Sequence, residues 1–147
     1  MLIRHLFVYG TLMSQACDAM GSGERNRLRR EARSLGPATL GARLFDLGQY
    51  PGLILSEAAG DVVHGEVFHL LQPAVTLAWL DRYEGIGWKA RDRDDYQRVN
   101  REVALANNVE LAVWTYVFQG SLRSARLLRS GCWRVRPWSL SSTPHCN

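Results

Sequence analysis

Stretches rich in aromatic and branched side chains, bounded by glycine, proline or asparagine, predict a chain with many strands. The first stretch covers residues 3–9 and stops at Gly10, which is typical of a buried strand followed by a loop. In the last, residues 109–118, apolar positions alternate with others after the segment Ala106-Asn107-Asn108, which predicts a hairpin with the stretch before it. Further strands are predicted at residues 38–47, 53–55, 62–71 and 96–105.

An amphipathic helix is expected early in the chain. Leu28, Ala32 and Leu35 recur at helical spacing, with arginines on the rest of the helical wheel. Because Gly36-Pro37 stops the pattern, the spacing predicts a helix over about residues 18–35.

A second helix is expected to begin at Pro73, because proline suits the first turn of a helix. Its apolar stripe continues to Tyr83, and Gly85 follows as a left-handed terminator, so the helix should end almost at Glu84. A short helix is also expected at residues 122–128, and the polar tail from about residue 139 is expected to be disordered.

A single domain accounts for the whole chain, since 147 residues with 46% hydrophobic content suffice for one core. No apolar run could span a bilayer and no signal-peptide layout is present, so we expect a cytoplasmic protein without a membrane partner. Cys17, Cys132 and Cys146 have no metal-binding or disulfide-framework spacing, so reduced thiols are expected. The four histidines form no zinc motif, and no metal is predicted.

The net charge of +4 and the pI near 9.3 raise the alternative of nucleic-acid binding. Binding would require both arginine clusters on one face, and neither cluster contains a recognition motif. The helical pattern accounts for the first cluster as a solvated helix face, so nucleic acid is not the expected partner. The clusters are Arg25, Arg27, Arg29, Arg30 and Arg33, and Arg123, Arg126, Arg129, Arg134 and Arg136.

The first candidate site is the segment Tyr9-Gly10-Thr11-Leu12, directly after the first strand. A glycine lets the backbone approach a ligand closely, and consecutive free N–H groups form a nest that binds anions. A carboxylate could bind there. A simple turn explains the same residues, because glycine is common in turns.

The second candidate is Glu84, which follows the apolar stripe of the second helix and has aromatic neighbours in Tyr83 and Trp88. An apolar wall and a nearby helix C-terminus disfavour the anion, which raises the pKa of a carboxyl group toward values useful for proton transfer. The alternative is a surface acid paired with an arginine.

The third candidate is the pair Tyr96 and Arg98 at the start of a strand. The tyrosine hydroxyl and the guanidinium could both donate hydrogen bonds to one oxygen-rich ligand. Alternation along a strand explains the two residues equally well.

The order of several segments resembles the gamma-glutamylcyclotransferase-like family over about residues 3–118. These segments are Phe7-Val8-Tyr9-Gly10-Thr11-Leu12, Tyr50-Pro51-Gly52-Leu53, Gly65-Glu66-Val67-Phe68, Leu80-Asp81-Arg82-Tyr83-Glu84-Gly85, Tyr96-Gln97-Arg98 and Trp114-Thr115-Tyr116-Val117-Phe118. The resemblance implies an α+β fold with a small, partly closed β-barrel and flanking helices. It also implies an enzyme that cyclises the glutamyl part of a gamma-glutamyl amine to 5-oxoproline and releases the amine.

The resemblance further implies roles for the candidate residues. The amides of residues 9–12 would hold the α-carboxylate of the substrate, and Glu84 would act as the general acid and base. Neither a metal nor an organic cofactor is required. Residues 86–95 are longer and more charged than the usual family link, so either Trp88 or Tyr96 could supply the pocket aromatic, and Cys132 replaces an acid common in the family.

Two questions stay open at this level. The chain could be a non-catalytic ligand-binding or interaction module that keeps the barrel and its anion loop, although the presence of Glu84 favours an enzyme. The amine that leaves, and the oligomeric state, have no signal in the sequence.

Overall fold

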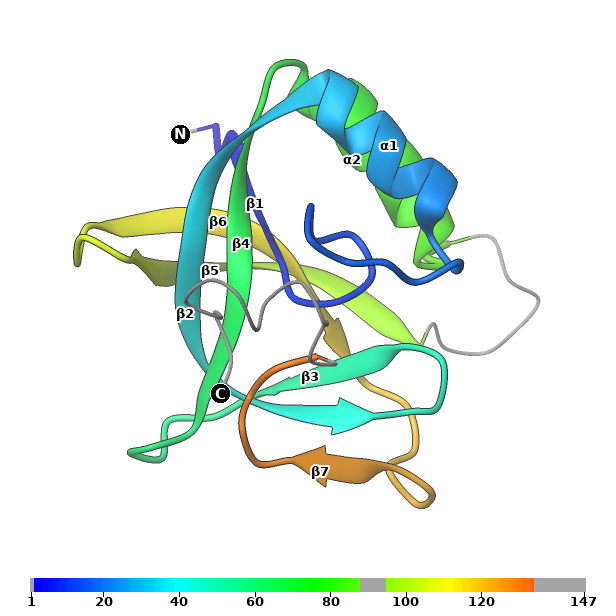
Figure 1. Ribbon diagram of the computed structural model, residues 1–147, viewed down its shortest axis with the longest axis vertical. Coiled ribbons are helices and arrows are strands. Elements are labelled where there is room, and N and C mark those ends of the chain that lie inside the picture. The colour runs from blue at the N-terminus through cyan, green and yellow to red at the C-terminus, as the bar shows by residue number, and fades with distance from the viewer. Residues whose placement is uncertain (1, 88–94, 134–147) are drawn as a thin grey trace.

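Seven strands and two helices make up the described part of the chain, residues 2–87 and 95–133 of a computed structural model (Figure 1). In chain order they are β1 (His5–Val8), α1 (Ser22–Glu31), β2 (Ala32–Asp46), β3 (Pro51–Leu55), β4 (Val62–Leu70), α2 (Pro73–Tyr83), β5 (Tyr96–Leu105), β6 (Glu110–Phe118) and β7 (Arg126–Leu128).

Five strands close into a small barrel. They pair in the order β2-β4-β1-β6-β5, and β5 pairs back with β2, where Ala38 lies opposite Leu105. The β1–β6 pair is parallel, with Leu6 opposite Trp114, whereas the other barrel pairs are antiparallel. The expected α+β fold, with a small barrel and flanking helices, is confirmed.

The first strand is buried on both faces. Leu6 and Val8 pack in a cluster with Leu28 of α1 and with residues of α2, whereas Phe7 packs with side chains of the other barrel strands such as Val67. A strand covered on both sides reads as a continuous apolar run rather than an alternating one, which explains the composition of this segment.

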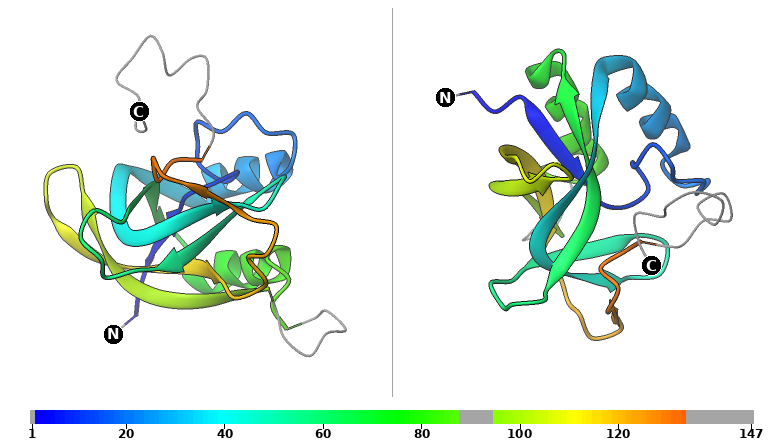
Figure 2. Two further views of the ribbon diagram at one scale, coloured as in Figure 1. Left: turned by 90° about the horizontal axis from the view of Figure 1, so that it is seen from below. Right: turned by 60° about the vertical axis from the view of Figure 1, so that its left-hand side comes forward.

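The long strand β2 joins the barrel to a second, smaller group of strands. Its first part pairs with β4, and a register shift between Ser34 and Gly36, where Gly36 has a φ of +94°, bends it. Its last residues pair with β3 on one side and β7 on the other (Figure 2). This extension brings the start of β3, at Pro51, next to the loop that follows β1.

The two helices lie side by side against the barrel (Figures 1 and 2). Glu31, at the end of α1, joins them, because its carboxylate accepts hydrogen bonds from Thr76 Oγ1 at 2.6 Å and Trp79 Nε1 at 2.9 Å on α2. Arg27 also pairs with Glu31 at 2.7 Å and lies over the Trp79 ring. The two helices are thereby joined through the end of α1.

Three expectations are corrected. The first helix spans Ser22–Glu31, because from Ala32 onward the backbone pairs with β4 instead, which leaves Leu35 40% exposed. The expected helix at residues 122–128 is wrong, since β7 pairs with β2 there. Cys132 is disulfide-bonded, so reduced thiols do not hold for it, while Cys17 is free. The tail expected to be disordered lies outside the described residues.

Candidate active site

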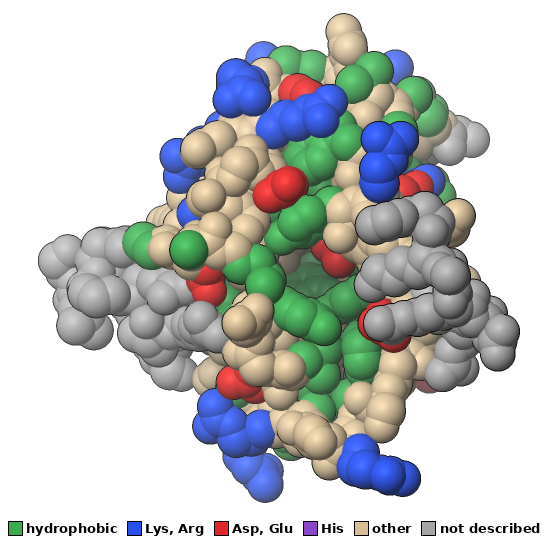
Figure 3. All heavy atoms as spheres, turned by 90° about the vertical axis from the view of Figure 1, so that its right-hand side faces the viewer, with side chains coloured by type: hydrophobic (Ala, Val, Ile, Leu, Met, Phe, Trp, Pro, Cys, Tyr) green, Lys and Arg blue, Asp and Glu red, His purple; other side chains and the backbone are tan. Residues whose placement is uncertain are grey.

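A cavity of about 300 Å³ opens at one end of the barrel. Figure 3 shows a hollow on this face that is lined mainly by hydrophobic side chains, with acidic side chains beside it and Lys and Arg gathered above and below. The loop after β1, the start of β3, the end of α2, the start of β5 and the end of β6 all contribute. The lining residues are Phe7, Val8, Tyr9, Gly10, Thr11, Leu12, Met20, Tyr50, Pro51, Tyr83, Glu84, Asp95, Tyr96 and Tyr116.

The loop after β1 forms a turn whose backbone amides are available. Met13 N–H donates to the Gly10 carbonyl at 3.1 Å, which leaves Thr11 and Leu12 as the central residues of the turn. Among the residues that the structure describes, none accepts a hydrogen bond from the N–H of Gly10, Thr11 or Leu12. Gly10 is required sterically, because a Cβ there would lie 2.6 Å from Pro51 Cγ.

Side chains from outside the turn hold it in place. Arg25 of α1 is 8% exposed and donates to the carbonyls of Thr11 and Asp18 at 2.7 and 2.9 Å. Buried Glu66 on β4 accepts hydrogen bonds from the N–H and hydroxyl of Ser14. The expectation that the arginines of this helix form only a solvated face is therefore wrong for Arg25, whose guanidinium points inward to the loop.

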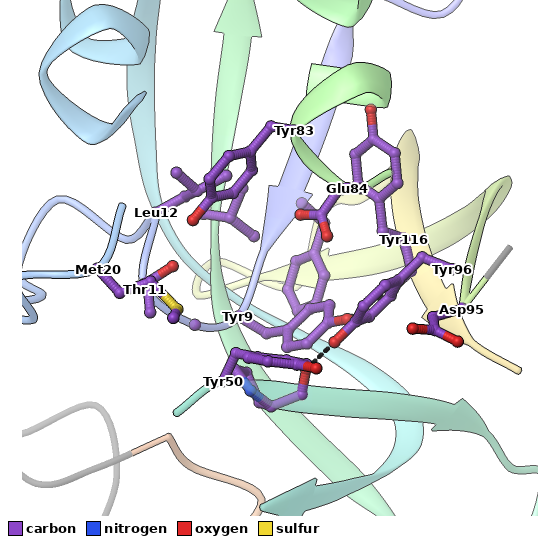
Figure 4. Close-up of a pocket in the computed structure, with 14 residues that line it drawn as sticks. Tyr9, Thr11, Leu12, Met20, Tyr50, Tyr83, Glu84, Asp95, Tyr96 and Tyr116 are labelled. Atoms are coloured by element: carbon purple, nitrogen blue, oxygen red, sulfur yellow. Dashed lines mark hydrogen bonds between the residues drawn. The ribbon is translucent and has the colours of Figure 1, made fainter. Parts of the chain in front are cut away.

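Glu84 is the residue that follows α2. Its backbone N–H still bonds to the Leu80 carbonyl at 2.9 Å, and Gly85, with a φ of +80°, then turns the chain away. Figure 4 shows the Glu84 carboxylate pointing into the cavity, toward the rings of Tyr9 and Tyr96. The predicted helix end and glycine terminator thus bring this carboxylate into the same cavity as the turn.

Four tyrosine hydroxyls lie in the cavity wall. Burial raises the pKa of each, and the negative charge of Glu84 adds to the effect in every case. Three have carbonyl or carboxylate acceptors: Tyr9 donates to the Tyr116 carbonyl at 2.6 Å, Tyr96 to the Pro51 carbonyl at 2.7 Å, and Tyr116 to Asp81 at 2.6 Å. The hydroxyl of the fourth, Tyr83, is hydrogen-bonded to Thr11. Neutral tyrosine side chains with fixed hydroxyls therefore lie around the carboxylate of Glu84.

Arg98 is not among the residues that line the cavity. It donates to both carboxylate oxygens of Asp81, at 2.8 and 3.2 Å, and its guanidinium lies 4.4 Å from the Trp114 ring centroid. Sequence reasoning missed Asp81, whose position three residues before Glu84 was its only signal. Tyr96 does line the cavity, while Trp88 lies outside the described residues.

Within the described ranges, no three His, Cys, Asp or Glu side chains gather closely enough to hold a metal ion. The helices of the same ranges include none that is long and apolar enough to cross a membrane.

The sequence of this chain matches a family model. The model described as "Gamma-glutamyl cyclotransferase, AIG2-like" covers residues 6–135. The chain belongs to this family. A Vibrio cholerae protein provisionally named gamma-glutamylcyclotransferase is 33% identical over 138 residues, which are 91% of this chain and 99% of that protein. Membership accounts for the segments that the sequence shares with the family.

Solved structures of low sequence identity share the fold. An AIG2-like protein from Mus musculus has a TM-score of 0.63 at 20% identity, over 84% of this chain and 82% of that one. The ytfP protein of Escherichia coli has a TM-score of 0.55 at 23% identity, over 88% and 95%. YkqA of Bacillus subtilis has a TM-score of 0.63 at 18% identity, and this chain covers 40% of its length. At these identities the likeness concerns the fold alone.

Proposed function

We propose that the chain converts a gamma-glutamyl amine into 5-oxoproline and the free amine, with Glu84 as general acid and base. The observation that carries this proposal is a carboxylate and a turn with available amides in one cavity of about 300 Å³. That size suits a glutamyl group and part of the amine attached to it.

The turn amides are the best candidates to bind the substrate's α-carboxylate. The described residues that line the cavity include no Lys, Arg or His, so among them only neutral donors are available to a bound carboxylate. Three of the four wall hydroxyls already donate to protein oxygens. The N–H groups of Gly10, Thr11 and Leu12 have no such partner in the described ranges, which supports them as the anion site.

The reaction requires one group that can both take and return a proton. Glu84 would accept a proton from the substrate's α-ammonium, and the freed nitrogen would attack the γ-carbonyl carbon to form the five-membered ring. The bond from that carbon to the amine nitrogen then breaks, while protons from the attacking nitrogen pass through Glu84 to the leaving nitrogen. No water is consumed. The tyrosines, with their raised pKa, would not compete as bases.

Tyr96 and Arg98 have different parts in this proposal. Tyr96 forms a wall of the cavity beside Pro51, to whose carbonyl it is bonded. Arg98 does not contact the substrate in this proposal. It helps to position Glu84 through its ion pair with Asp81, which lies on the helix that Glu84 follows.

The test is to incubate the purified chain with a panel of gamma-glutamyl amines and to detect 5-oxoproline and the free amine in equal amounts by mass spectrometry. Formation of both by the parent, at a rate at least about a hundredfold above that of Glu84→Gln, supports the proposal. Binding of 5-oxoproline without turnover of any member of a broad panel would instead indicate a ligand-binding module.

A further inference from the structure

The buried guanidinium of Arg25 has an unusual set of partners. It is 8% exposed, and it donates to two backbone carbonyls, those of Thr11 and Asp18. Within residues 2–87 and 95–133, Arg25 forms no ion pair with a carboxylate. Buried arginines are normally paired with an acid, because an uncompensated charge is costly to remove from water. The positive charge next to the turn is thus left without an anionic partner from the described protein.

One of those carbonyls belongs to the peptide group that carries the Leu12 N–H. A cation that binds the oxygen of a peptide group draws electron density from its nitrogen, so the N–H becomes a stronger donor. The peptide bonds are trans, which directs the Leu12 N–H away from the Thr11 oxygen and therefore away from Arg25. A ligand that accepts a hydrogen bond from the Leu12 N–H would therefore be stabilised by the positive charge of Arg25 without contacting the guanidinium.

We propose that Arg25 is a positioning residue of the carboxylate subsite, which fixes the turn and strengthens the Leu12 N–H as a donor to the ligand's carboxylate. The inference rests on the carboxylate-binding part of the proposed function. The charge also acts on the cavity wall: burial raises the pKa of the Tyr83 hydroxyl, and Arg25 is among the influences that lower it. Glu84 and Asp95 both line the cavity and repel an anion, and the charge of Arg25 acts against this repulsion.

The test compares two ligands that differ only in charge, 5-oxoproline and its carboxamide, by isothermal titration calorimetry. Arg25→Gln keeps a donor for a carbonyl but removes the charge, and it should lower the preference for the carboxylate about tenfold, the effect of a modest electrostatic interaction in a partly buried site. Arg25→Lys keeps the charge and should retain most of the preference. Arg29→Gln is the matched control, since Arg29 donates to the Ser14 carbonyl on the same loop, and its preference should equal that of the parent.

Equal weakening of both ligands by Arg25→Gln would reduce Arg25 to a structural anchor and overturn the inference. If that variant does not fold, the parent decides: 5-oxoproline should shift the Leu12 amide proton downfield more than its carboxamide does, and equal shifts would overturn the inference. If the preference for 5-oxoproline depends on Arg25 but the parent turns over no gamma-glutamyl amine, only the proposed function is contradicted. If the parent turns over a gamma-glutamyl amine but Arg25→Gln keeps the full preference for 5-oxoproline over its carboxamide, only the inference about Arg25 is contradicted.

Discussion

The Tyr116 hydroxyl donates a hydrogen bond of 2.6 Å to Asp81, three residues before Glu84. The same carboxylate accepts two hydrogen bonds from Arg98 on the neighbouring strand. The last turn of α2 is thereby tied to β5 and β6 of the barrel. Because Glu84 directly follows this turn, its direction into the cavity depends on the contacts of Asp81, a residue that does not itself line the cavity.

Asp81→Asn should lower turnover by about tenfold with little change in KM. The amide can still accept one hydrogen bond, but it lacks the negative charge that holds Arg98. Glu84 should then be displaced slightly, and a small displacement of a catalytic group is enough to lower the rate about tenfold. The pair is only partly buried, so the free energy of unfolding should fall by about 1–2 kcal/mol. Urea unfolding and steady-state kinetics measure the two effects separately. A loss of stability with unchanged turnover would show that Asp81 does not position Glu84.

Gly10→Ala should weaken binding of 5-oxoproline strongly, because the new Cβ would lie 2.6 Å from Pro51 Cγ and 3.0 Å from Cδ. The rigid proline ring cannot rotate away, so the turn must move. Pro51→Ala in the same chain should restore part of the binding. Gly23→Ala is the matched control, since nothing lies within 4 Å of a Cβ there. Titration calorimetry with the parent, the two single variants and the double variant measures the affinity for 5-oxoproline. Parent-like affinity in the single variant Gly10→Ala would contradict the close approach of Gly10 to Pro51.

The bridge between the helices should make stability depend on acid. Burial alone would raise the pKa of Glu31, but hydrogen bonds from Thr76, Trp79 and Arg27 outweigh it and lower the pKa to about 2. A carboxylate with a depressed pKa contributes stability above its unfolded value, near 4.5, and loses it as the pH falls toward 2. The parent should therefore lose roughly 2 kcal/mol more than Glu31→Gln between pH 6 and pH 2. Urea unfolding at several pH values measures this difference, and parallel curves would contradict it.

The sequence predicted the strands well because buried runs such as residues 3–9 and the hairpin of β5 and β6 carry strong local patterns. The prediction failed where pairing with a distant strand overrides the local spacing of apolar residues. Ala32 and Leu35 continue a helical pattern, yet both belong to β2, the strand that pairs with β4. Residues 126–128 likewise form a strand only because β2 offers an edge. No local pattern records such distant partners.

The candidate site divides in the same way. Glu84 and the turn at Gly10 could be predicted, since each stands at a boundary between a buried element and a loop. The buried direction of Arg25 could not, because in the sequence it is one of several similar arginines on an exposed helix. Its role depends on carbonyls 7 and 14 residues earlier in the chain, which only the folded loop brings to it.

Glu84→Gln is the decisive variant for the chemistry. The amide keeps the size and hydrogen-bonding capacity of the side chain but cannot accept the proton of the substrate's ammonium. Since a positioned acid/base group typically contributes about a hundred- to ten-thousand-fold to rate, kcat should fall by that order while the affinity for 5-oxoproline changes little. Glu57→Gln, at an exposed position outside the cavity, should match the parent in both respects. Turnover by Glu84→Gln within a few-fold of the parent would remove Glu84 from the mechanism, because no proton transfer through it would then limit the reaction.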